Sequence, residues 1–181
     1  MKIVSWNCCR GFDNRKPETI FAAFPDADIF VIQECREIDM DKAGFDKVRC
    51  DWYGDHKEAE TLPGNIRAER DLGIGIFWKD GITVEQDANF DKGNRYVVPY
   101  NITWAGKPFG LYAVWTKSGY ADYHVPVNNS LKKLSSTEKP IIFIGDFNTG
   151  SMRGSQNAHW YEKLKNNFLE KDFYNCAGNK V

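Results

Sequence analysis

A chain of 181 residues fits one domain, because typical domains contain roughly 100–200 residues. Hydrophobic residues make up 42% of the chain and aromatic residues 14%, so the sequence can close a compact core, and an intrinsically disordered protein is excluded. The 24 basic and 25 acidic residues nearly cancel, which excludes a broad positive field for holding a polyanion, so any phosphate must be captured locally.

The cysteines and the N-terminus indicate the cellular compartment. The five cysteines are odd in number, and Cys8 and Cys9 are neighbours, which is a poor start for a secreted disulfide framework. We therefore expect reduced thiols. The chain begins with a strand-like segment and not with a charged and apolar leader, and no later run approaches membrane-spanning length. These features predict a soluble, cytoplasmic protein with no membrane partner.

The first half of the chain alternates between strand and helix patterns. Residues 2–6 are typical of a strand, and residues 17–24 of a helix with Pro17 in its first turn. The apolar run at 28–34 does not alternate, which indicates a central strand buried on both faces. Residues 36–70 are charged and broken by glycine and proline, so we expect loops there, with one short strand near 48–53.

The second half is richer in strand patterns. Apolar or alternating runs recur at 73–78, 82–85, 95–104 and 109–115, and the turns at 79–81 and 105–108 predict hairpin connections. A helix is expected near 127–134, a second doubly buried strand at 140–145, and a last helix with Trp160, Leu164 and Phe168 on one face. Buried strands that alternate with amphipathic helices predict a layered α/β sandwich, with residues 1–181 forming one domain.

Three of the predicted strands end in carboxylate or amide side chains. These are Asn7, Glu34, and the pair Asp146 and Asn148. Loops at strand ends are where α/β folds collect catalytic groups, so the side chains are expected to converge. A purely structural interpretation is open for each of them, because Asp146 and Asn148 can form an Asx turn and Asn7 can cap a loop.

The chemistry of this set favours phosphoester hydrolysis. Mg²⁺ prefers oxygen ligands and is often held by one or two carboxylates together with phosphate oxygens of the substrate, a position that Glu34 suits. Hydrolysis also needs a group that orients or deprotonates water, and donors for the phosphoryl oxygens. Asp146 and Asn148 can fill these two roles.

The same residues resemble a known family. Ser-Trp-Asn at 5–7, Ile-Gln-Glu at 32–34 and Ile-Gly-Asp-Phe-Asn at 144–148 resemble, in that order, the first, second and fourth signature blocks of the endonuclease/exonuclease/phosphatase superfamily. That group includes pancreatic-type deoxyribonucleases, exonuclease III-like abasic-site endonucleases and inositol polyphosphate phosphatases. The resemblance covers about residues 2–150. It implies a deoxyribonuclease I-like sandwich of two mixed sheets flanked by helices.

The resemblance also implies a function and a role for each residue. It implies a metal-dependent phosphodiester hydrolase, most closely a nuclease, that uses Mg²⁺ or alternatively Mn²⁺ and acts on a phosphodiester expected to be nucleic acid. Glu34 is then the metal ligand, and Asn7 lies beside the metal and the phosphate. Asp146 positions the attacking water, and Asn148 donates to the substrate phosphate. Lys117 is a further candidate for phosphate binding, with an ordinary solvated lysine as the alternative.

The sequence departs from the family pattern at two places. Trp115 stands where many relatives place a catalytic histidine or tyrosine, and an indole cannot act as a useful acid. The family's closing Asp-His block is not found, and His159 does not replace it because it precedes a helix pattern. We therefore expect the final strands to be missing and the chain by itself to be weakly active or inactive. Two alternatives stay open: an inactive phosphate- or nucleic-acid-binding module, and a fragment completed by a partner or by self-association through the incomplete sheet.

Overall fold

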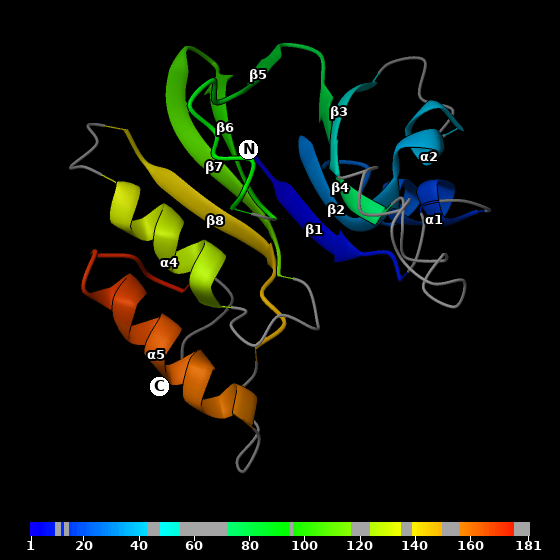
Figure 1. The fold of residues 1–181 in the computed structure, drawn as a ribbon. Coiled ribbons are helices and arrows are strands. Elements are labelled where there is room, and N and C mark those ends of the chain that lie inside the picture. Colours follow the sequence, from blue (N-terminus) through cyan, green and yellow to red (C-terminus); the bar gives the residue numbers. More distant parts are fainter. Residues whose placement is uncertain are drawn as a thin grey trace.

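In the computed structural model the chain forms two four-stranded sheets, with helices beside them (Figure 1). The structure describes residues 1–9, 12, 15–42, 48–54, 72–94, 96–116, 124–134, 139–149 and 156–175. Each sheet combines parallel and antiparallel pairs. The predicted α/β sandwich of two mixed sheets is therefore confirmed.

The first sheet has the strand order β1-β2-β4-β3. Its strands are β1 (Ile3–Asn7), β2 (Ile29–Arg36), β3 (Val48–Gly54) and β4 (Leu72–Lys79). β1 runs parallel to β2, with Asn7 opposite Gln33, and the other two pairs are antiparallel. β2 lies inside the sheet and its first five residues are buried, as its unbroken apolar run predicts.

The second sheet has the strand order β5-β6-β7-β8. Its strands are β5 (Ile82–Gln86), β6 (Val97–Trp104), β7 (Lys107–Trp115) and β8 (Ile141–Asp146). β6 and β7 form the predicted hairpin around Ala105 and Gly106, both of which have a positive φ. β8 runs parallel to β7, with Trp115 opposite Asp146.

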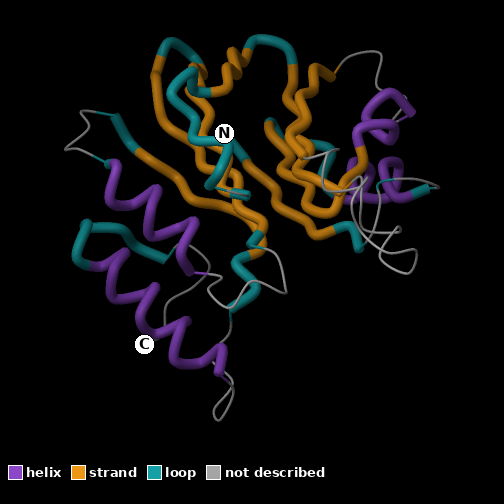
Figure 2. Tube along the Cα trace, in the orientation of Figure 1, coloured by secondary structure: helices purple, strands orange, loops and turns teal. Residues whose placement is uncertain are grey.

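The helices lie on opposite sides of the pair of sheets, as Figure 2 shows in purple. They are α1 (Lys16–Ala23), α2 (Glu37–Lys42), α4 (His124–Lys133) and α5 (Gln156–Leu169). Pro17 falls in the first turn of α1, where its missing N–H costs no helical hydrogen bond. None of the described helices combines the length and the apolar character that crossing a membrane requires.

Three apolar clusters hold these layers together. The central cluster lies between the two sheets and includes Ile74 from β4 and Leu111 from β7. A second cluster packs α1, α2 and the turn after β1 against the outer face of the first sheet, around Phe77. A third packs α4 and α5 against the second sheet through residues such as Val127 and Leu164. The architecture is therefore helix, sheet, sheet, helix.

Three predictions about individual elements were wrong. β8 is half-buried along its whole length because it is the last strand in the order of its sheet, not an interior strand. α2 lies where loops were predicted. The sequence did not reveal this helix because it has no apolar stripe, and its only buried hydrophobic residue among those described is Met40. The turn at residues 79–81 does not close a hairpin. It carries the chain from the first sheet to the second, since β5 pairs with β6 and not with β4.

Candidate active site

The polar ends of three strands meet at one place in the fold. β1 and β2 are parallel neighbours, so Asn7 and Glu34 lie at the same end of the first sheet. β8 belongs to the second sheet but contacts both of these strands, and it ends at Asp146. The convergence predicted for these side chains is therefore present, and it joins the two sheets.

Asn7 forms the link between the sheets. Its amide Nδ2 donates to Glu34 Oε1 at 2.9 Å and to Asp146 Oδ2 at 2.8 Å. Its amide oxygen accepts the backbone N–H of Cys9 at 2.9 Å. The two carboxylates therefore face each other across one nitrogen atom, although they lie 112 residues apart in the sequence.

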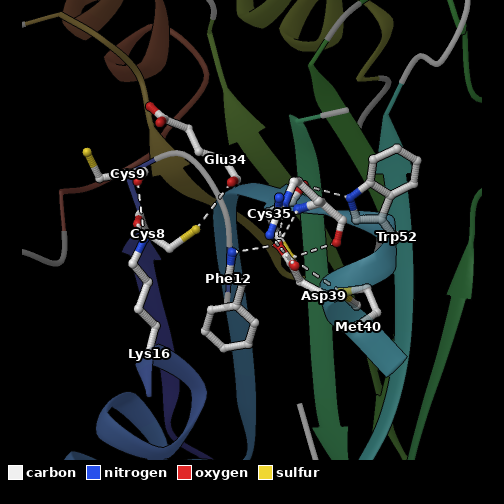
Figure 3. Close-up of polar contacts among 10 residues, drawn as sticks. Cys8, Cys9, Phe12, Lys16, Glu34, Cys35, Asp39, Met40 and Trp52 are labelled. Carbon is white, nitrogen blue, oxygen red and sulfur yellow. Dashed lines mark hydrogen bonds and ion pairs between the residues drawn. The ribbon is translucent and has the colours of Figure 1, made fainter. Parts of the chain in front are cut away.

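Glu34 sits on an irregularity of β2. The pairing of β2 with β4 shifts register between Gln33 and Cys35, and Glu34 has a φ of +60°. A bulge adds one residue to a strand and redirects its side chain, and such bulges are common beside active sites. The backbone carbonyl of Glu34 accepts the Cys8 thiol at 3.3 Å, a contact drawn in Figure 3. The irregular backbone therefore takes the Glu34 side chain out of the regular alternation of the strand.

Gln33, which precedes Glu34 in the second signature block, connects β2 to β1. Its side chain is 1% exposed, and Nε2 donates to Ser5 Oγ at 3.0 Å. The Gln33 amide therefore ties β2 to β1 just before both strands end. A buried amide must be hydrogen-bonded to be tolerated, so this pair also fixes the relative position of the two strands.

Asp146 is held by the close approach of β8 to β7. The preceding residue, Gly145, has a φ of +146°, and a Cβ at that position would lie 1.9 Å from the carbonyl oxygen of Val114. Asp146 Oδ1 accepts the backbone N–H of Asn148 at 2.9 Å, and the Asp146 carbonyl accepts the N–H of Thr116 at 3.0 Å. Glycine is therefore required before this aspartate for steric reasons.

Asn148 has a backbone shape that matches its place in the motif. Its φ is +47°, a left-handed conformation that asparagine adopts more easily than most residues. Its side-chain amide donates to the carbonyl of Thr116, and the Thr116 hydroxyl donates to the carbonyl of Phe147. Asp146 and Asn148 thus form the Asx turn of the structural interpretation, and Asn7 and Cys9 form another. The turns leave the functional interpretation open as a prediction.

The remaining sequence candidates lie elsewhere. Lys117 falls outside the described residues. Trp115 is 4% exposed and packs against Tyr96 with ring centroids 5.0 Å apart, so it belongs to the core between the sheets. His159 is exposed on α5, next to the ring of Trp160. In the β7–β8 pairing, Trp115 lies opposite Asp146.

Sequence reasoning missed a set of side chains behind the site. Asp39 of α2 is fully buried and binds Arg36 and the backbone N–H of Phe12. Burial raises the pKa of the Asp39 carboxyl, but hydrogen bonds from Arg36 and Phe12 and the charge of Arg36 outweigh burial and lower the pKa below the ordinary value of 3.8. The available signal was the spacing of Arg36 and Asp39, three residues apart at a strand end.

The donor set fits a hard divalent cation. The described residues contain no group of three or more histidine, cysteine, aspartate or glutamate side chains arranged around a common point. They do place the carboxylates of Glu34 and Asp146 on either side of the Asn7 amide. Mg²⁺ is commonly held by one or two carboxylates and keeps several waters, so two carboxylates are sufficient. As placed here, Asn7 turns its amide nitrogen toward the carboxylates and its oxygen toward Cys9.

Comparison with protein families gives one match that covers most of the chain. Residues 4–163 match the model described as the endonuclease/exonuclease/phosphatase family. Comparison with curated protein sequences returns no significant match. The family match includes the three strand ends that form the site.

Several solved structures share the fold. The endonuclease domain of TRAS1, a telomere-specific non-LTR retrotransposon, is 20% identical with a TM-score of 0.62, and the match covers 98% of this chain and 74% of that one. Danio rerio TDP2 complexed with a single-strand DNA product is 15% identical with a TM-score of 0.61, covering 90% and 64%. The Bacteroides thetaiotaomicron mannosyl-6-phosphatase Bt3783 is 16% identical with a TM-score of 0.55, covering 89% and 69%. At these identities the likeness concerns the fold, and the chain spans less than two thirds of the TDP2 structure.

Proposed function

Because the chain belongs to the endonuclease/exonuclease/phosphatase family, we propose that it is a metal-dependent phosphodiester hydrolase, most closely a nuclease. The observation that carries this proposal is the Asn7 amide, which bridges Glu34 of one sheet and Asp146 of the other. Two carboxylates that share one donor repel each other, and an arrangement of this kind suits a cation. The three residues come from three separate signature blocks.

Glu34 is the residue we propose as the metal ligand. Its carboxylate is turned out of β2 by the register shift, and a hard cation prefers such an oxygen donor. A bound Mg²⁺ or Mn²⁺ supplies Lewis-acid stabilisation of the phosphate charge. Asn7 serves beside it, as a donor to both carboxylates in the described geometry. A ligand role for Asn7 requires its amide oxygen to face the ion and stays a prediction.

Asp146 is proposed to orient the attacking water and to accept its proton. One of its oxygens bonds to Asn7 and the other to the N–H of Asn148. Each carboxylate oxygen has two lone-pair positions, so both oxygens keep capacity for a water molecule. Two fixed hydrogen bonds hold the carboxylate plane in one orientation, which is what positioning a nucleophile requires.

Asn148 is proposed to donate to a phosphoryl oxygen. Its amide has two N–H bonds, and one of them is directed to the carbonyl of Thr116. We assign the other N–H to an anionic oxygen of the substrate. Neutral donors placed where negative charge develops stabilise the transition state without any reorganisation of the site. Lys117 stays a candidate for the same task.

The substrate class is a phosphodiester, and nucleic acid is our first choice. Support comes from the fold shared with a retrotransposon endonuclease domain and with a TDP2 structure holding a DNA product. The fold is also shared with a sugar phosphatase. The net charge of −1 favours a small or single-stranded substrate over a long duplex that the protein would have to coat.

A phosphate-binding module without turnover is the second candidate. It is favoured by Trp115, which is buried in the core and whose indole cannot act as an acid where the family resemblance implies one. A site with a metal ligand and donors but no acid for the leaving group would bind phosphate and turn it over slowly. The same experiment separates the two candidates.

The test compares hydrolysis of bis(p-nitrophenyl) phosphate and of a single-stranded oligonucleotide in Mg²⁺, in excess chelator, and with Glu34→Gln. We expect weak turnover that the chelator abolishes and that Glu34→Gln lowers by about 10²-fold or more, the scale of losing a central charged catalytic group. Glu85→Gln, an exposed carboxylate on β5, is the matched control and should retain full activity. Turnover that persists in chelator and in Glu34→Gln would remove the proposed mechanism. Metal binding at Glu34 without turnover would favour the binding module.

A further inference from the structure

Behind the site lies a buried carboxylate that the proposed chemistry does not use. Asp39 is 0% exposed and accepts Arg36 Nη2 at 2.7 Å on one oxygen and Arg36 Nε at 2.9 Å on the other. The second oxygen also accepts the backbone N–H of Phe12 at 2.8 Å. Figure 3 shows Asp39 between Phe12, Cys35 and Met40. This carboxylate therefore bonds to two separate segments of the chain.

Those two segments carry the central residues of the site. Phe12 lies five residues after Asn7 in the sequence, and it is 0% exposed in the cluster around Phe77. Arg36 is the last residue of β2, two residues after Glu34. Asp39 thus joins Phe12 to the end of β2 after Glu34.

Other side chains hold the same segments by their carbonyl groups. Lys16 Nζ donates to the carbonyls of Cys8 at 2.8 Å and Cys9 at 3.2 Å. Trp52 Nε1 donates to the carbonyl of Cys35 at 2.8 Å (Figure 3). Lys16 acts on the first segment and Trp52 on the second, whereas Asp39 acts on both.

The physical cost of this arrangement indicates a role beyond stability. Asp39 is buried whereas the Arg36 side chain is 32% exposed, so the cost of desolvation falls mainly on the Asp39 carboxylate, and an apolar residue of similar size in its place is often equally stabilising. Glu34 has a left-handed φ of +60°, which persists only where the surroundings over-determine the backbone. The fork of two hydrogen bonds from Arg36, which lies beside the bulge, adds geometric specificity to this contact.

We propose that Asp39 is a positioning residue that holds Phe12 and the end of β2 together, so that Asn7 and Glu34 converge correctly for metal binding. The inference rests on the proposed function, because it assigns a purpose to the geometry of the proposed metal site. Residues that orient metal ligands from behind typically change metal affinity by 10–100-fold when they are substituted.

The test is the affinity for Mn²⁺ alone, measured from the EPR signal of free Mn²⁺, together with thermal unfolding. Asp39→Asn keeps the size of the side chain and removes the charge that binds Arg36. We expect Mn²⁺ affinity to fall by about tenfold or more. The matched control is Asp28→Asn, because Asp28 accepts the N–H of Lys2 at 2.7 Å and ties β1 to β2 at the end far from the site. Its Mn²⁺ affinity should stay within about twofold of wild type.

A second variant separates positioning from folding. Arg36→Met with Asp39→Leu removes both charges, so no unpaired charge is left buried, and thermal unfolding checks that the variant is folded. It also removes the acceptor for the Phe12 N–H, so the Mn²⁺ affinity should stay low. Wild-type affinity in either Asp39 variant would overturn the positioning role. Failure of wild type to bind Mn²⁺ would instead overturn the proposed function on which the inference rests.

Discussion

A methyl group added at Gly145 tests how the second sheet sets the position of Asp146. In Gly145→Ala the new Cβ would lie 1.9 Å from the carbonyl oxygen of Val114, and 2.7 Å and 2.9 Å from its backbone carbon and nitrogen. These are main-chain atoms of β7, in register with Gly145 across the β7–β8 pair. No side-chain rotation can relieve the contact, so the strands must separate at this point.

Two costs add up in this variant. A non-glycine residue in a sparsely populated backbone region costs about 1–3 kcal/mol. Overpacking against a fixed backbone costs about another 1–3 kcal/mol. We therefore expect Gly145→Ala to lower the free energy of unfolding by about 2–6 kcal/mol, a large part of the about 5–15 kcal/mol that domains possess.

Gly106→Ala is the matched control in the same sheet. Gly106 also has a positive φ, +73°, but an added Cβ meets no atom within 4 Å. It should cost about 1–2 kcal/mol, for the backbone alone. Urea unfolding followed by tryptophan fluorescence measures both. If the two alanine variants are equally stable, the close approach of β8 to β7 is not what requires glycine before Asp146.

Two further predictions concern carboxylates. Asp146→Asn should lower hydrolysis by about 10²-fold while Mn²⁺ still binds, which steady-state kinetics and EPR can check, and a near-normal rate would exclude Asp146 as the base. For Asp39 the lowered pKa sets the sign of a pH effect: its contribution is present above the ordinary value of 3.8 and is lost as the pH falls through the lower folded pKa. The stability advantage of wild type over Asp39→Asn should therefore be full at pH 7 and shrink in urea unfolding below about pH 4, and a constant difference would contradict this.

The strand ends could be predicted because the strands are marked by composition. β2 shows an unbroken apolar run, and such a run in an α/β fold indicates an interior strand. The residue at its carboxyl end then lies where the strands of the sheet stop. The polar residue that follows the run, Glu34, therefore had a predictable place. The parallel pairing of β1 with β2 then brings Asn7 to the same end of the strands. This part of the site follows from periodicity and from the general placement of functional groups at strand ends.

Other features could not be predicted, because they depend on contacts between distant segments. The burial of Asp39 depends on Phe12 and on the fold of α2, and α2 has no apolar stripe that would reveal it. The half-burial of β8 depends on its place at the end of the sheet order, although its apolar residues are as suitable for an interior strand. Composition gives hydrophobicity, whereas exposure is decided by neighbours.

Asn7 and Asp146 each combine a local turn with a contact between the two sheets. Each residue uses one oxygen to accept a backbone N–H two residues further on, which closes a local turn. The remaining polar atoms, Nδ2 of Asn7 and Oδ2 of Asp146, are then fixed in direction and bond to each other. A side chain that closes its own turn loses little further entropy when it takes part in a site, because the turn has already restricted it. The short spacing of Asp146 and Asn148 is therefore a requirement of the turn and, under the proposed function, of the site as well. A substitution that preserves charge but breaks the turn should damage both.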